Sequence, residues 1–128
     1  MEQRTEKRTE QDRTGNIGAV LKVIKEKRET MITTVTLNPA IDKTITTSRL
    51  LPGQVNRGDS VKNIAGGKGI NVTKVLRQYG SSVCALGFLG GYTGRFIEEY
   101  VEGLGAESAF TQIAGETRTS TNVLSMDG

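Results

Sequence analysis

The chain has 128 residues, enough for one modest domain, and a formal net charge of +3. It contains no histidine and one cysteine, which excludes Ser-His-Asp and Cys-His catalytic systems and a structural zinc site. No apolar run approaches the roughly 18 residues that span a bilayer, so we expect no membrane partner. The single thiol suits a reducing compartment, and we expect a cytoplasmic protein.

The first thirty residues differ in composition from the rest. Residues 1–30 hold eight Lys and Arg and six Asp and Glu, and begin with a segment without apolar side chains, so we expect a disordered extension. Residues 17–27 carry apolar side chains at helical spacing and would suit a short amphipathic helix. In an alternative interpretation the extension is a misread leader and Met31 is the true start, because residues 27–31 can be encoded by a purine-rich ribosome-binding sequence before an ATG. Residues 31–128 lack a basic stripe with interleaved aromatics, so we expect no nucleic-acid partner.

From residue 31 onward, segments typical of strands come first. Residues 32–37 are rich in β-branched side chains and end at an Asn-Pro turn, which predicts a strand. Residues 42–47 and 54–64 are polar and contain Thr and Val. Their weak hydrophobicity predicts a small flap of two extended segments that lies off the main core.

The next predicted element is a helix that starts in the glycine-rich turn at residues 66–69 and ends near Tyr79, with Gly80 as its C-terminal cap. Its apolar face is predicted to consist of Val72, Val75, Leu76 and Tyr79. Residues 83–89 form a nearly continuous apolar run, which predicts a strand buried on both faces. Cys84 in this run is expected to be an inert core residue.

A second helix is predicted from Thr93 to about Gly103, followed by strands at residues 110–113 and 117–125. This order of strands and helices predicts an α/β fold with parallel core strands. Asp127-Gly128 after the last strand is typical of a hairpin turn. The second strand of that hairpin does not follow, so we expect the chain to be truncated.

The clearest chemical signal is the run Gly66-Gly67-Lys68-Gly69-Ile70-Asn71. Glycines at the start of a helix let backbone N–H groups approach a ligand closely, and the helix N-terminus favours anionic or oxygen-rich groups. Lys68 adds a positive charge and Asn71 an amide at the same place. A tight turn with no ligand is the alternative. The run is not a Walker A loop, because no Ser or Thr follows Lys68.

Residues 66–73, with Gly80 and Gly90 at their spacings, resemble the first signature of the PfkB sugar kinases. Three further segments resemble the phosphofructokinase and tagatose-phosphate kinase branch of that family: residues 36–42, 88–94 and 117–122. The matches cover nearly all of residues 31–128. The resemblance implies a ribokinase-like α/β fold, of which this chain is the N-terminal part of the parallel-sheet core, with a small β lid formed by the flap.

The resemblance also implies a substrate site. Its positions fall on Asp42, Gly66, Gly67, Lys68, Asn71, Arg118 and Arg57. Asp42 would accept hydrogen bonds from two sugar hydroxyls, and Arg118 would grip the phosphate already on the substrate through its planar fork. Lys68 and, more weakly, Arg57 are candidates for the same phosphate, Arg57 in the site of a partner subunit. The alternatives are an exposed turn acid for Asp42 and a solvated strand residue for Arg118.

The activity implied is transfer of a phosphoryl group from ATP, with Mg²⁺, to fructose 1-phosphate. Tagatose 6-phosphate is the alternative substrate, and a non-catalytic binding or dimerisation module is the alternative from another class. The catalytic base of this family is an aspartate in a second motif, Gly-x-Gly-Asp, which also builds the ATP site and is absent from this sequence. We therefore expect no catalytic, cofactor-binding or metal-binding residue in this chain, no activity of the chain alone, and a homodimer through the lid in the longer enzyme.

Overall fold

The computed structural model describes Gly18 and residues 30–128. The chain divides into two units, residues 1–31 and 32–128, and the second unit is described here by itself. The disorder expected for residues 1–30 and the helix expected for 17–27 lie outside the described residues, apart from Gly18 and Thr30. None of the helices in the described ranges is long and apolar enough to cross a membrane.

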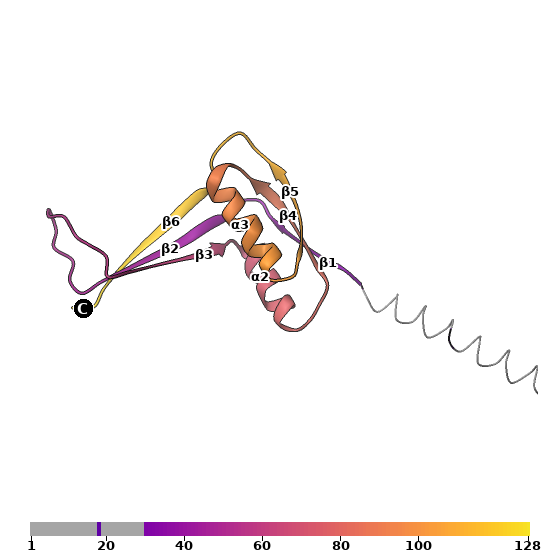
Figure 1. Cartoon of the computed structure of the whole chain (residues 1–128), viewed down its shortest axis with the longest axis horizontal. Coiled ribbons are helices and arrows are strands. Elements are labelled where there is room, and N and C mark those ends of the chain that lie inside the picture. Colours follow the sequence, from indigo (N-terminus) through magenta and orange to yellow (C-terminus); the bar gives the residue numbers. More distant parts are fainter. Residues whose placement is uncertain (1–17, 19–29) are drawn as a thin grey trace, which may run out of the picture. The chain divides into compact units, whose positions relative to one another are not determined.

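The core of the second unit is a parallel sheet of three strands (Figure 1). Its strands are β1 (Ile32–Thr36), β4 (Val83–Leu89) and β5 (Glu107–Gln112), in the spatial order β1-β4-β5. Both neighbouring pairs are parallel. The predicted parallel α/β core is therefore confirmed.

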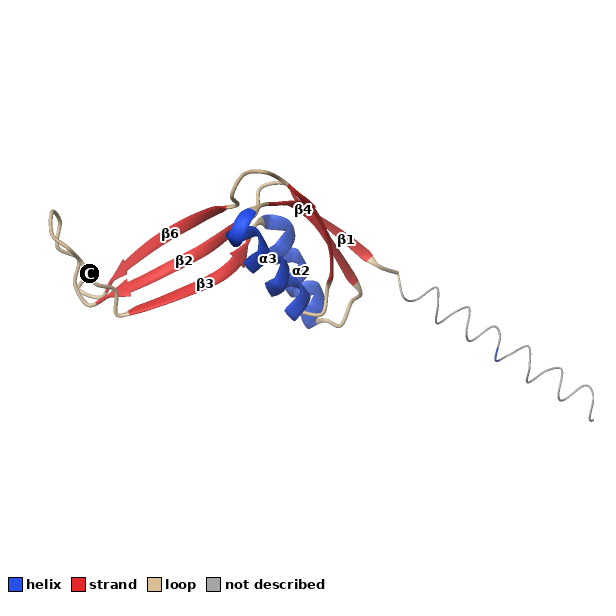
Figure 2. Cartoon of the chain, turned by 45° about the horizontal axis from the view of Figure 1, so that its top comes forward, coloured by secondary structure: helices blue, strands red, loops and turns tan. Residues whose placement is uncertain are grey.

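Two helices cover the same face of this core sheet (Figure 2). They are α2 (Lys68–Gln78) and α3 (Gly91–Gly103). Right-handed crossovers are the rule in such folds, and two of them that step in the same direction along a sheet place both helices on one face. The buried cluster between helices and strands includes Ile70, Ala85, Leu89, Ile97 and Val101. The predicted helix over residues 93–103 is confirmed, and it buries Ile97 and Val101.

The prediction that the strand at residues 83–89 is buried on both faces is wrong. Its side chains alternate, and Phe88 on the face away from the helices is 42% exposed. Val35, on the same face of β1, is 56% exposed. The continuous apolar run gave no sign that the two faces of the strand differ in exposure, because the exposure depends on which face of the sheet the helices cover.

The apolar face predicted for α2 is wrong at three of its four positions, and only Leu76 packs against the core. Val72 and Val75 are each 50% exposed and Tyr79 is 84% exposed, whereas Ile70 and Thr73 are fully buried. The helix turns this other face inward because it lies very close to β1, where a side chain on Gly69 would collide with the Val35 backbone. The end of the helix agrees with the prediction: Gly80 has a φ of 77° and its N–H donates to the carbonyl oxygen of Arg77.

A second sheet, which we call the lid sheet, extends away from the core sheet (Figure 1). It consists of β2 (Ala40–Thr47), β3 (Ser60–Gly66) and β6 (Arg118–Ser125) in the order β3-β2-β6. The β2–β3 pair is antiparallel and the β2–β6 pair is parallel. The sequence indicated two extended flap segments but gave no sign that β6 joins them.

The chain passes between the core sheet and the lid sheet at three places (Figure 2). The first crossing joins β1 to β2 at residues 37–39, and the second joins β3 to α2 at Gly67. The third joins β5 to β6 at residues 113–117. Most of the candidate site residues lie at or beside these crossings.

Candidate functional site

A pocket of about 420 Å³ lies where β1 ends, α2 begins and β6 begins. It is lined by Val35, Thr36, Leu37, Asn38, Gly67, Lys68, Gly69 and Arg118. Two of these described lining side chains are cationic and none is acidic. In open α/β sheets, ligands bind beyond the carboxyl ends of the strands, and this pocket occupies such a position on β1.

The start of α2 presents backbone N–H groups to this pocket. Gly67 precedes the helix with a φ of 124°, and a side chain there would lie 2.6 Å from the Thr36 methyl group, so glycine is required on both counts. Among the described residues no side chain caps this end of the helix. The first N–H groups of a helix have no partner within it and carry a partial positive charge, so this turn suits an anionic or oxygen-rich ligand.

Arg118 reaches the pocket from the lid sheet. It is the first residue of β6, it pairs with Ala40, and its Nε donates to Asn38 Oδ1 at 3.1 Å. The bond joins the first and third crossings and uses one of the five guanidinium donors. Sequence reasoning treated Asn38 only as a turn residue, although it lies inside one of the matching segments, residues 36–42.

Asp42 lies beside the pocket on β2. Its carboxylate occupies the space that a side chain on Gly66 would need, so the first glycine of the run makes room for the acid. Asp42 is exposed, and its negative charge acts on the ammonium group of Lys74. Partial burial lowers the pKa of Lys74, and the charge of Asp42 opposes this shift.

Lys74 connects several parts of the site, although sequence reasoning missed it. Its Nζ donates to the carbonyl oxygen of Ala65 at 2.5 Å and to Asn71 Oδ1 at 3.2 Å. The first bond holds the backbone just before Gly66, and the second occupies the amide oxygen of Asn71. The amide NH₂ of Asn71 therefore remains as a donor for a ligand. The available signal was position: residue 74 lies one helical turn after Asn71.

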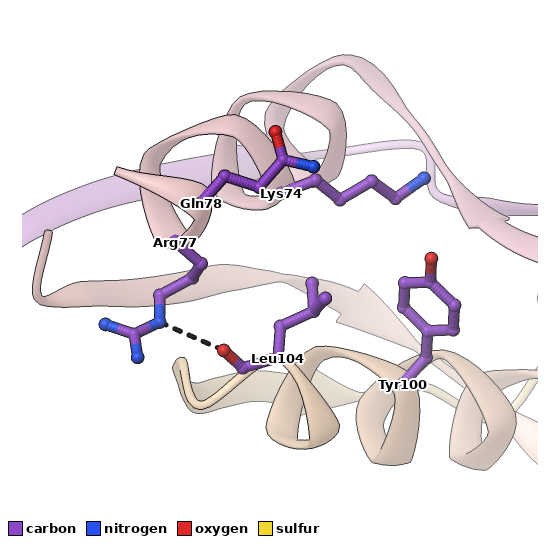
Figure 3. Close-up of a pocket in the computed structure, with 5 residues that line it drawn as sticks. All are labelled: Lys74, Arg77, Gln78, Tyr100 and Leu104. Carbon is purple, nitrogen blue, oxygen red and sulfur yellow. Dashed lines mark hydrogen bonds between the residues drawn. The ribbon is translucent and has the colours of Figure 1, made fainter. Parts of the chain in front are cut away.

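A second hollow, of about 250 Å³, lies between α2 and α3 (Figure 3). It is lined by Lys74, Arg77, Gln78, Tyr100 and Leu104. Its cationic groups already serve the fold: Arg77 Nε donates to the Leu104 carbonyl oxygen at 3.0 Å, and Lys74 Nζ lies 5.4 Å from the centre of the Tyr100 ring. The contacts around this hollow therefore hold the two helices together, and the hollow is a weaker candidate for a ligand site than the first pocket.

The structure brings together most of the residues that the sequence indicated. Gly67, Lys68 and Arg118 line the pocket. Asp42 and Gly66 lie together beside it, and Asn71 belongs to the same region through Lys74.

Arg57 lies apart from this group. Its carbonyl oxygen accepts a bond from Thr47 Oγ1 at 3.3 Å, at the opposite end of β2 from Ala40, the partner of Arg118. The strand between these ends is about 23 Å long at 3.3 Å per residue. Within one chain Arg57 is therefore remote from the pocket.

No group of three or more His, Cys, Asp or Glu side chains that could hold a metal ion occurs in the described part of the chain. No acidic side chain lines the pocket among the described residues, so these residues do not supply the carboxylate ligands that the Mg²⁺ ion implied by the resemblance would need. No step of the chemistry below is derived through a metal.

Known proteins similar to this chain are carbohydrate kinases. Residues 31–128 match the family model of the pfkB family carbohydrate kinases. The tagatose-6-phosphate kinase of Staphylococcus epidermidis is 45% identical over 94 residues, covering 73% of this chain and 30% of that protein. The 1-phosphofructokinase of Xanthomonas campestris is 51% identical over 87 residues, covering 68% of this chain and 27% of that protein.

Among solved structures, the tetrameric inhibited form of phosphofructokinase-2 from Escherichia coli superposes with a TM-score of 0.69 at 27% identity. The match covers 77% of this chain and 33% of that one. This chain thus spans about a third or less of the length of the relatives that it matches.

Proposed function

Because this chain belongs to the pfkB family of carbohydrate kinases, we propose that it is the sugar-phosphate-binding part of a 1-phosphofructokinase. The longer enzyme would transfer the γ-phosphoryl group of ATP to the C6 hydroxyl of fructose 1-phosphate and form fructose 1,6-bisphosphate. The observation that carries the proposal is the pocket that Arg118, Lys68 and the open start of α2 form at the end of β1.

The pocket suits a phosphate group. Two cationic side chains line it, no acidic one does so among the described residues, and the first turn of α2 supplies backbone N–H donors. An arginine is well matched to a phosphate because its planar fork donates two parallel hydrogen bonds. Arg118 is positioned for this role by its bond to Asn38.

Asp42 and Asn71 beside the pocket suit the hydroxyl groups of the sugar. A carboxylate accepts bonds from two adjacent hydroxyls, and the free NH₂ of Asn71 donates to a hydroxyl oxygen. The function of these residues is to bind and orient the sugar phosphate, so that its C6 hydroxyl is presented to the phosphoryl donor.

In the complete reaction, the C6 oxygen forms a bond to the γ-phosphorus, the bond from that phosphorus to the β-phosphate oxygen breaks, and ADP leaves. The hydroxyl proton passes to a base, which in this family is an aspartate of the Gly-x-Gly-Asp motif. This chain has no such motif. We therefore propose that it binds the phosphosugar and has no kinase activity by itself. ATP and Mg²⁺ would be bound by residues of the longer enzyme.

Two alternatives remain part of the proposal. Tagatose 6-phosphate is the second candidate substrate, because a tagatose-6-phosphate kinase matches more of this chain than a 1-phosphofructokinase does, 73% against 68%, at a lower identity, 45% against 51%. A non-catalytic binding or dimerisation module is the second candidate function. The exposed side chains of Val61 and Val123 on the lid sheet support a homodimer through this sheet. In such a dimer Arg57 would be a candidate to reach the pocket of a second subunit.

Isothermal titration calorimetry of the full chain tests the proposal. We expect binding of fructose 1-phosphate that is stronger than binding of tagatose 6-phosphate. Arg118→Ala should weaken it about 10- to 100-fold, because a hydrogen bond to a charged group contributes roughly 1.5–3 kcal/mol. Arg49→Ala is the matched control, since Arg49 is exposed, pairs with Asp127 and does not line the pocket. Absence of binding of either phosphosugar would refute the proposal.

The remaining alternatives need two other measurements. A coupled assay for ADP should detect no turnover of fructose 1-phosphate by the purified chain, and turnover above the blank would contradict the proposed inactivity. Sequencing the coding region after codon 128 separates a kinase from a module. A continuation that encodes Gly-x-Gly-Asp supports the kinase, and a stop codon supports the module.

A further inference from the structure

The third crossing, which leads from the core sheet into the lid sheet, is fastened to the first turn of α3. Glu116 Oε1 accepts a bond from the backbone N–H of Thr93 at 2.7 Å. The Thr93 hydroxyl lies 2.6 Å from the same oxygen and 2.5 Å from the Thr117 carbonyl oxygen, and its one proton serves either acceptor. Figure 1 shows the loop after β5 curving back, so that β6 starts beside one end of α3.

Thr117 is held on the other side by Gly90. The N–H of Thr117 donates to the Gly90 carbonyl oxygen at 2.9 Å, and the N–H of Gly90 donates to Thr117 Oγ1 at 2.9 Å. Thr117 is buried, and its N–H, carbonyl and hydroxyl groups all have partners at the start of α3. This residue therefore has little freedom to move relative to α3.

The carboxylate of Glu116 suits its position electrostatically. It lies at the N-terminus of α3, where the helix carries a partial positive charge. Hydrogen bonds from the side chain and backbone of Thr93 lower its pKa, which favours the ionised form. Gly91 has a φ of 69° and leaves the space that the carboxylate occupies. The start of α3 is thus filled by an internal anion, whereas the start of α2 opens into the pocket.

Arg118 follows directly after this fastened segment. Its backbone starts β6, and its side chain reaches Asn38 and the pocket. Two restraints therefore define the direction of the guanidinium. Its Nε is bonded to Asn38, and the preceding residue, Thr117, is held at the start of α3. Loss of the Glu116 contacts would remove one attachment of this segment to α3 and leave the Gly90 bonds to Thr117 in place, so the start of β6 would be held less firmly.

We propose that Glu116 is a positioning residue of the sugar-phosphate site, which orients Arg118 by anchoring the third crossing to α3. The inference rests on the proposed function of Arg118. A helix cap that contributes only to stability is the competing explanation. The two differ in one respect: a positioning residue affects binding only as long as Arg118 is present.

The test uses Glu116→Ala and Glu116→Gln in the full chain, each with Arg118 or with Arg118→Ala. Gln keeps an acceptor oxygen without the charge, so Glu116→Gln should retain part of the anchoring to Thr93. This variant provides the test if Glu116→Ala does not fold. Glu99→Gln, at an exposed position on α3, is the matched control. The first readout is the affinity for fructose 1-phosphate at pH 7, measured by calorimetry or by NMR titration.

We expect affinity to fall about tenfold for Glu116→Ala, about threefold for Glu116→Gln and not at all for Glu99→Gln. In the Arg118→Ala background the Glu116 substitutions should cause no further loss. An equal further loss in that background would overturn the inference, and so would an unchanged affinity of both Glu116 variants.

A second readout needs no ligand. The ¹H–¹⁵N signal of Arg118 Nε in the free chain should shift and exchange faster in Glu116→Ala, and remain as in the parent for Glu99→Gln. An unchanged Arg118 signal would overturn the inference even if the chain binds the sugar phosphate. If the parent chain binds no phosphosugar, the proposed function fails, and this signal still reports whether Glu116 orients Arg118.

Discussion

The buried hydroxyl pair between α2 and β1 allows a quantitative prediction. Thr73 Oγ1 donates to the Gly69 carbonyl oxygen at 3.1 Å, which uses its only proton. We therefore assign Thr34 as the donor in the 2.7 Å contact between Thr34 Oγ1 and Thr73 Oγ1. Both residues are buried, so the two substitutions have unequal consequences.

Thr73→Val removes both bonds and leaves the Thr34 hydroxyl buried without its acceptor. A lost hydrogen bond costs roughly 1 kcal/mol and a stranded polar group roughly 1–3 kcal/mol, so we expect a loss of about 2–3 kcal/mol in the free energy of unfolding. Thr34→Val leaves the bond from Thr73 to Gly69 intact, and we expect a loss of about 0.5–1 kcal/mol. The double variant, which has no stranded hydroxyl, should lose only about 1 kcal/mol.

Urea unfolding followed by circular dichroism measures the four free energies of this cycle. Thr33→Val is the matched control, because Thr33 is exposed on the same strand and its replacement should change stability by less than about 0.5 kcal/mol. The single variants should be non-additive by about 1.5–3 kcal/mol. Additive single variants, or equal losses for Thr34→Val and Thr73→Val, would refute the assigned direction of the hydrogen bonds.

Three further predictions concern the core, the site and pH. Ile97→Ala should lower the free energy of unfolding in urea by about 2–5 kcal/mol, because Ile97 is fully buried. Val75→Ala should cost less than about 1 kcal/mol, because Val75 on α2 is half exposed. Equal losses would contradict the observation that Val75 lies on the exposed face of α2. Lys74→Met should weaken binding of fructose 1-phosphate about three- to tenfold in calorimetry, because Asn71 loses the bond that orients its amide, while Lys62→Met on exposed β3 should leave affinity unchanged. The pKa of Glu116 is lower in the folded chain than its ordinary value of 4.5, so its contribution to stability is present above that value and is lost as pH falls through the folded pKa. Glu116→Gln should therefore reduce the fall in the free energy of unfolding at acid pH. An identical dependence of that free energy on pH in both proteins would contradict this.

Much of the site could be predicted because its residues lie in short runs of sequence with strong local requirements. Gly67 must be glycine at its φ of 124°, and the run up to Asn71 is contiguous at the start of one helix. Asn38 and Glu116 were missed because their partners lie in other elements, and the bond from Lys74 to Ala65 likewise reaches back to β3. The Arg118–Asn38 bond joins residues 80 positions apart, and no local pattern indicates such a pair.

The sequence by itself determined the order of strands and helices, the cap at Gly80 and the family to which residues 31–128 belong, because periodicity, backbone conformation and contiguous motifs are local properties. Only the tertiary structure decided which faces are covered. Both helices lie on one side of the core sheet, so Val35 and Phe88 on the other side stay exposed. The close approach of Gly69 to β1 turned α2 onto Ile70 and Thr73 instead of Val72 and Val75. The pairing of β6 with β2 likewise brought Arg118 to the pocket, because strand pairing depends on contacts between distant segments and not on the composition of either strand.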